Sequence, residues 1–328
     1  MPSTASLLRL FLLSVVAAVV LYAITAVASD LDAVGSAMLQ LGSVGWLMVL
    51  GLSLINYGLR FVRWQGYLVQ LEHRVPPVSS AGYYLAGFAF TTTPSKAGEA
   101  VRSLYLRRRG VGYIQSLAAL FAERLVDLVA MVLLALAAAW TFPQAQMPVI
   151  LLTVAILVLL HAVHSTGLHD LISRWLARLP WDRFRRLGVH GLDLLRSAST
   201  LLSSRPLYAG LALGLVAWGA EGVGFWLILE YLDLPVSLAL AVGVYAAAVL
   251  VGALSFIPGG LGSTEAVMVL LLVLLGADTP TAVAATLICR LATLWFAVLI
   301  GLVAVVSFEL RGDRLAGMAT TPVESKQP

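Results

Sequence analysis

Charged residues are scarce in this chain. Lys, Arg, Asp and Glu together make up 12% of its 328 residues, about half of their share in a typical soluble domain. Hydrophobic residues make up 60%, and the mean hydropathy is +0.93. These values exclude a soluble fold of this length. We predict an all-α integral membrane protein, because helices satisfy their backbone hydrogen bonds inside a bilayer.

Cysteine is nearly absent, and recognisable metal or nucleotide motifs are absent as well. The single cysteine, Cys289, lies in an apolar segment, which excludes a disulfide framework and a thiolate metal site. The histidines at 161, 164 and 169 do not have the spacing of a zinc site. The glycine-rich stretch 259–262 lacks the lysine of a P-loop. We expect no metal, no cofactor and no nucleic-acid partner.

Long apolar segments dominate the sequence. Six of them are interpreted as full membrane spans: 7–28, 44–59, 113–140, 149–164, 206–230 and 281–307. The first span could instead be a signal peptide, but its apolar run of about 20 residues favours a retained helix. The second ends in Arg60-Phe-Val-Arg63-Trp64, a basic and aromatic run that is typical of a membrane interface.

Two further apolar segments are broken. Residues 236–276 contain Phe256-Ile-Pro-Gly-Gly-Leu-Gly-Ser-Thr-Glu265, where one proline and three glycines cannot continue a helix. Residues 78–93 are too short to cross and stop at Pro94. A helix with Ser95 as its N-cap is expected to follow and to carry Glu99 and Arg102. Both segments are predicted to be re-entrant hairpins, because irregular backbone at membrane depth must meet protein or a wet cavity.

The two broken segments are copies of one unit. Residues 84–136 and 250–302 align without a gap at an offset of 166 and share 15 identities over 53 positions. Apolar matches are expected in so hydrophobic a chain, but the pairs Glu99/Glu265 and Arg124/Arg290 are not. Each copy thus has a broken apolar segment, a glutamate, and an arginine 25 residues later.

The basic residues are confined to one set of loops. Loops 29–43, 141–148, 230–236 and 276–280 contain no Lys or Arg, whereas 60–74, 96–109, 165–205 and 309–328 hold nearly all of them. The positive-inside rule places the basic set and both termini in the cytoplasm of a bacterial inner-membrane protein. Segment 165–205 is predicted to form amphipathic helices on the membrane surface.

This topology requires the two copies to have opposite orientations. We predict a single membrane domain over 1–308, with repeat 1 at about 44–140 and repeat 2 at about 206–307, followed by the tail 309–328. Inverted repeats with broken helices that meet near the midplane are the architecture of alternating-access transporters.

Three motifs carry a resemblance to a known family. In chain order they are Pro94-x-x-x-Gly98-Glu99-x-x-Arg102, Glu123-Arg124-x-x-Asp127 and Pro258-Gly-Gly-x-Gly262-x-x-Glu265. They resemble the flippase-like membrane domain of lysylphosphatidylglycerol synthases, and the resemblance covers about residues 7–307. It implies a lipid-handling domain; in bifunctional synthases this domain moves an aminoacylated phospholipid between leaflets, and stand-alone relatives accompany envelope glycolipid and hopanoid pathways.

The chain departs from the synthases after its last span. About twenty residues follow that span, whereas the soluble aminoacyl-transferring domain would need a few hundred. The resemblance therefore does not imply synthase activity, and it leaves the lysylated lipid in doubt as the substrate.

Buried charges and the glycine turn supply the candidate binding residues. They are Glu99, Arg102, Glu123, Arg124, Asp127, Glu221, Gly259, Gly260, Gly262, Glu265 and Arg290. We hypothesise that Glu99, Glu265, Arg124 and Arg290 converge on one polar cavity between the repeats, where Arg290 pairs with Glu265 of its own repeat or with Glu99 of the other. Intramembrane charges usually mark pathways or relays, but each group also has a structural interpretation. Glu123, Arg124 and Asp127 share a helix face and could be an internal ion pair. Glu221 could have the purely structural role of a hydrogen bond to a neighbouring helix. The glycines could form a phosphate-binding nest, or only permit a tight turn.

Two functions of different class follow. The favoured one is a translocase for an anionic or phosphate-bearing lipid or lipid-linked head group, because a scaffold needs neither an inverted repeat nor buried charges. The alternative is a non-transporting scaffold for an envelope-biosynthesis enzyme. An enzyme is not expected, although Glu99 and Glu265 could act as acid and base. The expected partners are anionic membrane lipids, with an envelope enzyme or a second copy of the chain as alternatives.

Overall fold

The computed structural model describes residues 31–93, 99–178 and 181–310. Within these ranges every regular element is helical. The α-helices are α2 (Leu31–Gln40), α3 (Gly42–Gln70), α4 (Pro77–Phe88), α5 (Arg102–Arg107), α6 (Tyr113–Thr141), α7 (Pro143–His164), α8 (Thr166–Ala177), α9 (Asp182–Leu201), α10 (Ser204–Tyr231), α11 (Leu238–Leu254), α12 (Ser263–Leu274), α13 (Thr279–Arg290) and α14 (Phe296–Leu310). The predictions for the span 7–28, the Ser95 cap and the tail 309–328 fall wholly or largely outside the described residues.

The described chain is an all-α membrane protein. Four helical stretches are long and apolar enough to cross a bilayer: Gly42–Gln70, Pro143–His164, Ser204–Tyr231 and Thr279–Phe308. They correspond to four of the six expected spans. The expected span at 113–140 forms α6, which is 29 residues long and carries three charged residues. These charges face other helices rather than lipid, as the contacts below show.

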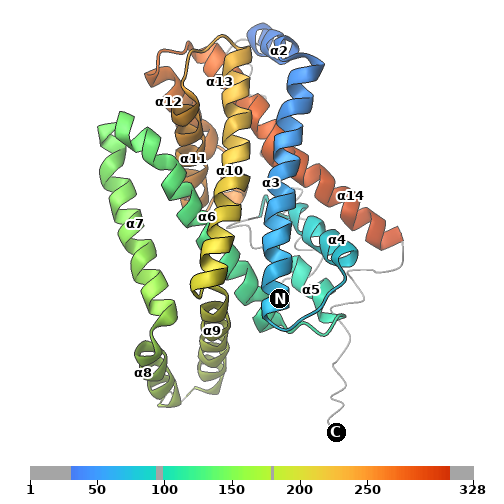
Figure 1. The fold of residues 1–328 in the computed structure, drawn as a ribbon, viewed down its shortest axis with the longest axis vertical. Coiled ribbons are helices and arrows are strands. Elements are labelled where there is room, and N and C mark those ends of the chain that lie inside the picture. The colour runs from blue at the N-terminus through green and yellow to red at the C-terminus, as the bar shows by residue number, and fades with distance from the viewer. Residues whose placement is uncertain (1–30, 94–98, 179–180, 311–328) are drawn as a thin grey trace.

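The links between helices gather at two opposite ends of the molecule (Figure 1). Helix α2, the turn from α6 to α7 and the start of α13 lie at the upper end, and all three lack Lys and Arg. Helices α8 and α9, with their seven flanking and internal arginines, lie at the lower end. These segments without Lys and Arg thus lie at one end of the molecule, and the arginine-rich segment lies at the other. Which end faces the cytoplasm stays a prediction.

The first broken segment, residues 77–107, begins and ends near the lower end. Helix α4 stops at Phe88 and is followed by turns as far as Thr93. After residues 94–98, a short 3-10 turn at 99–101 leads into α5, which packs on α4. Helix α4 also packs closely on α14. A Cβ atom placed on Gly301 of α14 would lie only 2.1 Å from the backbone nitrogen of Ala89, at the end of α4. Gly301 therefore lets the two backbones touch.

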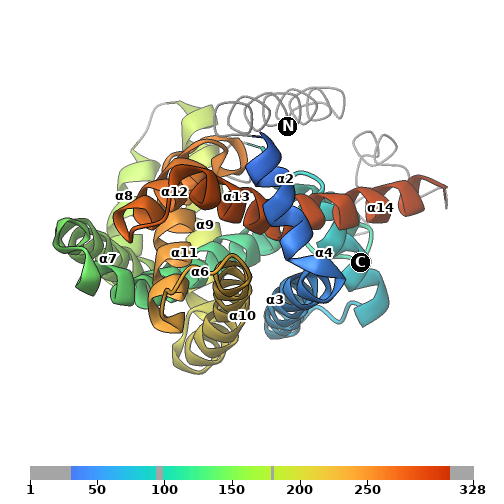
Figure 2. The same ribbon diagram turned by 90° about the horizontal axis from the view of Figure 1, so that it is seen from above.

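The second broken segment, residues 238–274, enters and leaves at the upper end, where α10 stops and α13 starts (Figures 1 and 2). Its two helices pack on each other and are joined by a turn in the left-handed region. Gly259, Gly260 and Gly262 have φ values of 63°, 65° and 86°. Phe256 also has a positive φ, 57°, which is uncommon for a bulky side chain.

The tips of the two broken segments meet inside the protein. A Cβ atom placed on Gly259 would lie 3.4 Å from the Cα of Thr92, which is fully buried. The segments thus come from opposite ends and touch at their turns, as an inverted repeat requires. Their position relative to a membrane stays a prediction.

Candidate functional site

A cluster of charged side chains lies where α3, α6, α10 and α13 converge with the two tips. Its described acids are Glu99, Glu123, Asp127, Glu221 and Glu265, and its arginines are Arg60, Arg63, Arg102, Arg124 and Arg290. All ten residues come from helices or from the tips. Because a buried charge is costly unless it is paired, the contacts of each show how the cluster is held together.

Glu123 is the centre of the cluster in repeat 1. Its side chain is fully buried. Arg102 bonds it at 2.6 Å, and the hydroxyl of Tyr84 donates to it at 2.8 Å. Arg124 lies 3.2 Å from the same carboxylate, and the Arg102 guanidinium stacks 3.9 Å from the centre of the Trp64 ring. Glu123 is thus held from three helices, which fixes α6 against α4 and α5.

Asp127 is held one turn further along α6. Arg63 bonds it at 2.5 Å, and the indole nitrogen of Trp218 donates to the same oxygen at 3.0 Å. Arg124 lies 3.4 Å from its second oxygen. Asp127 therefore joins α6 to both α3 and α10, the latter through Trp218.

The expectation that Arg60 and Arg63 lie at a membrane interface was wrong. Helix α3 continues to Gln70, and the two arginines are 5% and 3% exposed. Arg60 lies 3.5 Å from Glu123 and 3.7 Å from Asp127. A basic and aromatic run looks the same in sequence at an interface and inside a bundle, because the acids that neutralise it are on another helix.

The charges of repeat 2 are fewer. The Nε of Arg290 donates to Glu265 at 2.6 Å, and another nitrogen of its guanidinium donates to the carbonyl of Gly259 at 2.7 Å. Arg290 is the last residue of α13, directly before a π-helical turn at Leu291–Trp295. Such turns often occur at functional sites. Within this turn, the carbonyl of Thr293 accepts a hydrogen bond from Tyr57 at 2.5 Å.

The glycine turn satisfies its own amide groups. The amide of Gly262 donates to Glu265 at 2.7 Å, in the capping arrangement of a helix N-terminus. The amides of Gly260 and Leu261 donate to carbonyls within the turn. These contacts favour the interpretation that the glycines form a buried turn over the interpretation that they form a phosphate nest.

The two repeats place their equivalent charges in equivalent contacts. Arg124 lies 3.4 Å from Glu99, and Arg290 lies 2.6 Å from Glu265. Both pairs are separated by 25 residues, and the offset of 166 maps one pair onto the other. Of the two acids that were weighed as partners of Arg290, the structure gives Glu265, from its own repeat.

A cavity with a volume of about 270 Å³, called the larger cavity below, lies between the repeats. Arg124 and Asp127 line it from α6, and Arg290 lines it from α13. Most of the remaining wall is apolar: Leu128, Met131, Trp218, Val249, Leu250, Ala253, Leu254, Phe256, Ile257 and Leu294. One charged corner and a long apolar wall are suited to an amphiphile with a small anionic group.

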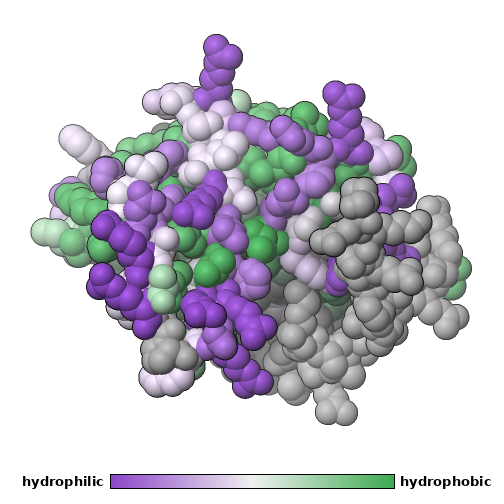
Figure 3. Space-filling view, turned by 90° about the horizontal axis from the view of Figure 1, so that it is seen from below, coloured by the Kyte–Doolittle hydropathy of each residue, from purple (hydrophilic) through white to green (hydrophobic). Residues whose placement is uncertain are grey.

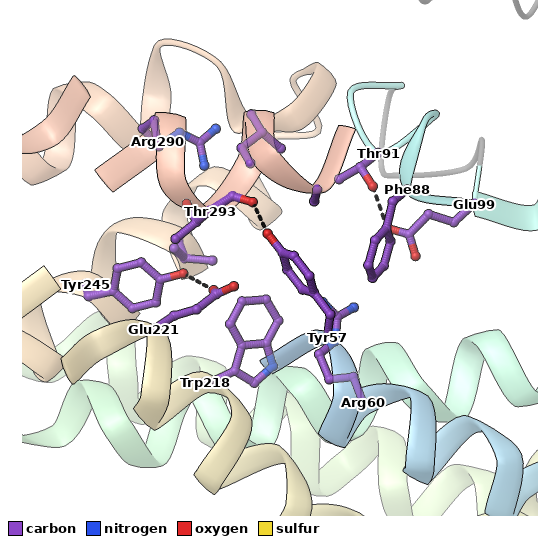
Figure 4. A pocket seen from close by; sticks show the side chains of 13 residues that line it. Tyr57, Arg60, Phe88, Thr91, Glu99, Trp218, Glu221, Tyr245, Arg290 and Thr293 are labelled. Carbon is purple, nitrogen blue, oxygen red and sulfur yellow. Dashed lines mark hydrogen bonds between the residues drawn. The ribbon is translucent and has the colours of Figure 1, made fainter. Parts of the chain in front are cut away.

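A smaller, more polar cavity of about 60 Å³ adjoins it (Figure 4). Arg60 and Tyr57 reach it from α3, and Glu99 reaches it from the first tip. Glu221 faces it from α10 while accepting a hydrogen bond from Tyr245. The volume is enough for about two water molecules. Trp218, Val249, Arg290 and Leu294 line both cavities.

Two arginines of the cluster that line a cavity are incompletely bonded: Arg124, whose Nε and one terminal nitrogen make no hydrogen bond to the described residues, and Arg60. The Nε of Arg60 is buried and makes no hydrogen bond to the described residues. Its guanidinium lies 4.9 Å from the ring centre of Trp218 and 5.8 Å from that of Phe88. Both carboxylates near it are shared with other arginines. Arg60 can therefore offer hydrogen bonds to an anion at small cost to the existing pairs.

The predicted site residues divide into those that line a cavity and those that support them. Arg124, Asp127, Gly259, Gly260 and Arg290 line the larger cavity, and Glu99 and Glu221 line the smaller one. Arg102, Glu123, Gly262 and Glu265 line neither. The hypothesis that Glu99, Glu265, Arg124 and Arg290 all face one cavity thus holds for the two arginines only.

Sequence reasoning missed the residues of α3 and the aromatic partners. Asn56, Arg60 and Arg63 are buried on one face of that helix. Their spacing of four and then three residues is the signal that could have placed both arginines inside the bundle. Tyr84 and Tyr245 gave no such signal, since their roles depend on carboxylates far away in sequence.

Comparison with known proteins finds a family model and relatives that cover most of the chain. The family described as Lysylphosphatidylglycerol synthase TM region matches residues 9–301. A UPF0104 membrane protein of Methanothermobacter thermautotrophicus is 23% identical over 248 residues, covering 68% of this chain and 73% of that protein. A second UPF0104 membrane protein, of Pyrococcus horikoshii, is 24% identical over 277 residues, covering 73% and 80%.

Proposed function

Since the chain belongs to the lysylphosphatidylglycerol synthase TM region family, we propose that it translocates a membrane lipid or a lipid-linked head group that bears an anionic or phosphate group. The observation that supports this most is the larger cavity, which Arg124 of repeat 1 and Arg290 of repeat 2 line together. A site made of one equivalent cation from each inverted repeat belongs to neither half alone. It changes whenever the halves move relative to each other.

The arginines supply the recognition of the head group. A guanidinium presents planar, paired donors that match a phosphate or carboxylate, and it keeps its charge in an apolar environment. In the empty site Glu99 and Glu265 neutralise the two arginines. A bound anion takes over part of that role, so the buried charge stays compensated throughout the cycle. The apolar wall accommodates the first methylene groups of the lipid.

The meeting of the two tips gives the proposed motion. Gly259 is in contact with the Thr92 backbone and also accepts the hydrogen bond from Arg290. A shift of one broken segment against the other would therefore move the head-group arginine and open the cavity toward one end. We propose alternating access of this kind, in a bacterial inner membrane with both termini in the cytoplasm and with no catalytic step.

Reconstitution tests this function. The purified protein is placed in liposomes with fluorescently labelled anionic, zwitterionic and polyprenyl-phosphate lipids, and leaflet exchange is followed by quenching from outside. We expect exchange of the anionic or phosphate-bearing lipids well above that of protein-free liposomes, with zwitterionic lipids moved least. Absence of exchange for every lipid would reject transport and favour the scaffold.

A further inference from the structure

The loop between α7 and α10 exposes aromatic and aliphatic side chains at the lower end of the molecule. On α8 the exposed residues Leu168, Leu171 and Trp175 follow at intervals of three and four, along one face. On the other side of the connection, Trp181, Phe184 and Leu187 follow at intervals of three and are 61–67% exposed. Each apolar stripe is the exposed face of an amphipathic helix, while other faces of α8 and α9 pack on each other and α9 also packs on α6 and α7.

The two helices are held beside the membrane by their connections. A single residue, Ser165, separates the membrane-length helix α7 from α8. Two residues separate α9 from α10, which is also of membrane length. At a rise of about 1.5 Å per residue, the 12 residues of α8 extend over about 18 Å. The stripe of α8 therefore stays within about 18 Å of the end of α7.

Positive charge surrounds these stripes. Segment 165–205 contains seven arginines and three aspartates, a balance of +4 that equals the net charge of the whole chain. Arg185 pairs with Asp182, whereas Arg183 and Arg186 form no ion pair with the described residues. Figure 3 shows this lower face, where hydrophilic side chains lie beside apolar ones.

We propose that α8 and α9 bind the anionic surface of the adjacent leaflet of the same membrane, with the tryptophans and Phe184 at the acyl boundary and the arginines on lipid phosphates. Aromatic side chains prefer the interface, and arginines next to an anionic leaflet are attracted within a Debye length. An ordinary solvent-exposed loop would need the arginines but not the two apolar stripes. The proposal does not depend on the transport function.

A fluorescence experiment tests this proposal on the full chain. An environment-sensitive dye is attached at His190→Cys, an exposed position of α9, in a Cys289→Ser background. The protein is reconstituted with phosphatidylcholine, alone or mixed with phosphatidylglycerol, and each vesicle type is also made with brominated acyl chains. We expect quenching by brominated lipid on the order of twofold stronger in the anionic vesicles, and we expect high salt to reverse this difference.

Two variants separate the contributions of charge and aromatic surface. Arg183→Gln/Arg185→Gln/Arg186→Gln should remove the dependence on phosphatidylglycerol, and Trp181→Ala/Phe184→Ala should weaken quenching in both vesicle types. Arg196→Gln, on the last turns of α9, is the matched control and should behave like the parent. Leaflet exchange should stay within about twofold of the parent in the triple variant, which distinguishes this surface from the transport site. Quenching of the parent that is independent of phosphatidylglycerol, or a dependence on phosphatidylglycerol that persists in the triple variant, would overturn the proposal and point to a protein partner.

Discussion

The two repeats hold equivalent arginines in very different surroundings. In repeat 1, Arg124 belongs to a network in which Glu123 contacts arginines from α3, α5 and α6, and Asp127 contacts arginines from α3 and α6. In repeat 2, Arg290 contacts Glu265 and a backbone carbonyl of the turn. A dense network cannot lose one contact without disturbing the others. A single pair next to a glycine turn can lose its contact without disturbing other pairs. We interpret repeat 1 as the fixed half of the site and repeat 2 as the half that changes.

The difference between the repeats has a simple origin in the sequence. At the positions equivalent to Glu123 and Asp127, repeat 2 has Cys289 and Thr293. Thr293 uses its hydroxyl to bond the carbonyl of Cys289 within its own helix. Without two further acids, repeat 2 cannot neutralise additional arginines. The pair of Arg290 and Glu265 therefore stands beside an apolar cavity wall.

Glu123→Gln should have the largest effect on stability. It removes the carboxylate that pairs with Arg102 and one of the three that neutralise Arg124, and breaking a buried pair costs about 3–5 kcal/mol. Thermal unfolding in detergent should show this loss, while Glu230→Gln, an exposed glutamate at the end of α10, should change little. Equal stability of the two variants would show that the network of repeat 1 is not a structural anchor.

Glu265→Gln should lower the free energy of unfolding by less, about 1.5–3 kcal/mol, because it weakens one hydrogen bond to a charged group. Glutamine can still cap α12, and Arg290 keeps its bond to Gly259. Leaflet exchange should nevertheless fall much further than stability. Glu123→Gln is measured by the same two assays. If stability and exchange decreased in the same proportion in both variants, the proposed difference between the two repeats would be rejected.

Gly301→Ala tests the contact between α14 and the first broken segment. The new Cβ would meet the Ala89 backbone, which cannot move as a side-chain end can, so a loss of about 1–3 kcal/mol is expected. Gly58→Ala in α3 has open space around its Cβ position and is the matched control. It should be neutral or stabilising by up to about 1 kcal/mol. If both variants unfold at the same temperature, the two backbones are not in contact.

Asp278→Ala should have the smallest effect. Asp278 caps α13 by accepting the amide of Thr281 at 3.1 Å, and loss of such a cap costs about 1 kcal/mol. Hydrogen bonds from Thr281 lower the pKa of the Asp278 carboxyl. The stabilisation by the Asp278 cap is therefore fully present at pH values above the ordinary aspartate pKa, and it is lost as the pH falls through the lower pKa of the folded state. A difference from the parent that stayed constant down to strongly acidic pH would contradict this role.

Much of the fold could be predicted because it depends on local patterns. Apolar length placed four spans, the proline and glycines placed the break at 258–262, and the offset of 166 matched Glu99 with Glu265 and Arg124 with Arg290, which make equivalent contacts in the structure. The wrong assignment of Arg60 and Arg63 had a physical reason. Their partners are 63 and 64 residues away in sequence, and no local pattern reports such contacts. A polar cavity between the repeats was expected, but its lining residues from α3, α10 and α11 were beyond prediction for the same reason.

The central claim is that one arginine from each repeat grips an anionic lipid head group in the larger cavity. Its most direct test is leaflet exchange of an anionic lipid by Arg124→Lys, Arg290→Lys and the double variant, with thermal stability measured on the same samples. Lysine keeps the charge but loses the planar fork of donors. We predict that Arg290→Lys lowers exchange by about tenfold or more with a small change in stability, and that the double variant lowers it further. Exchange that decreased only in proportion to stability in all three variants would contradict the claim and make both arginines structural.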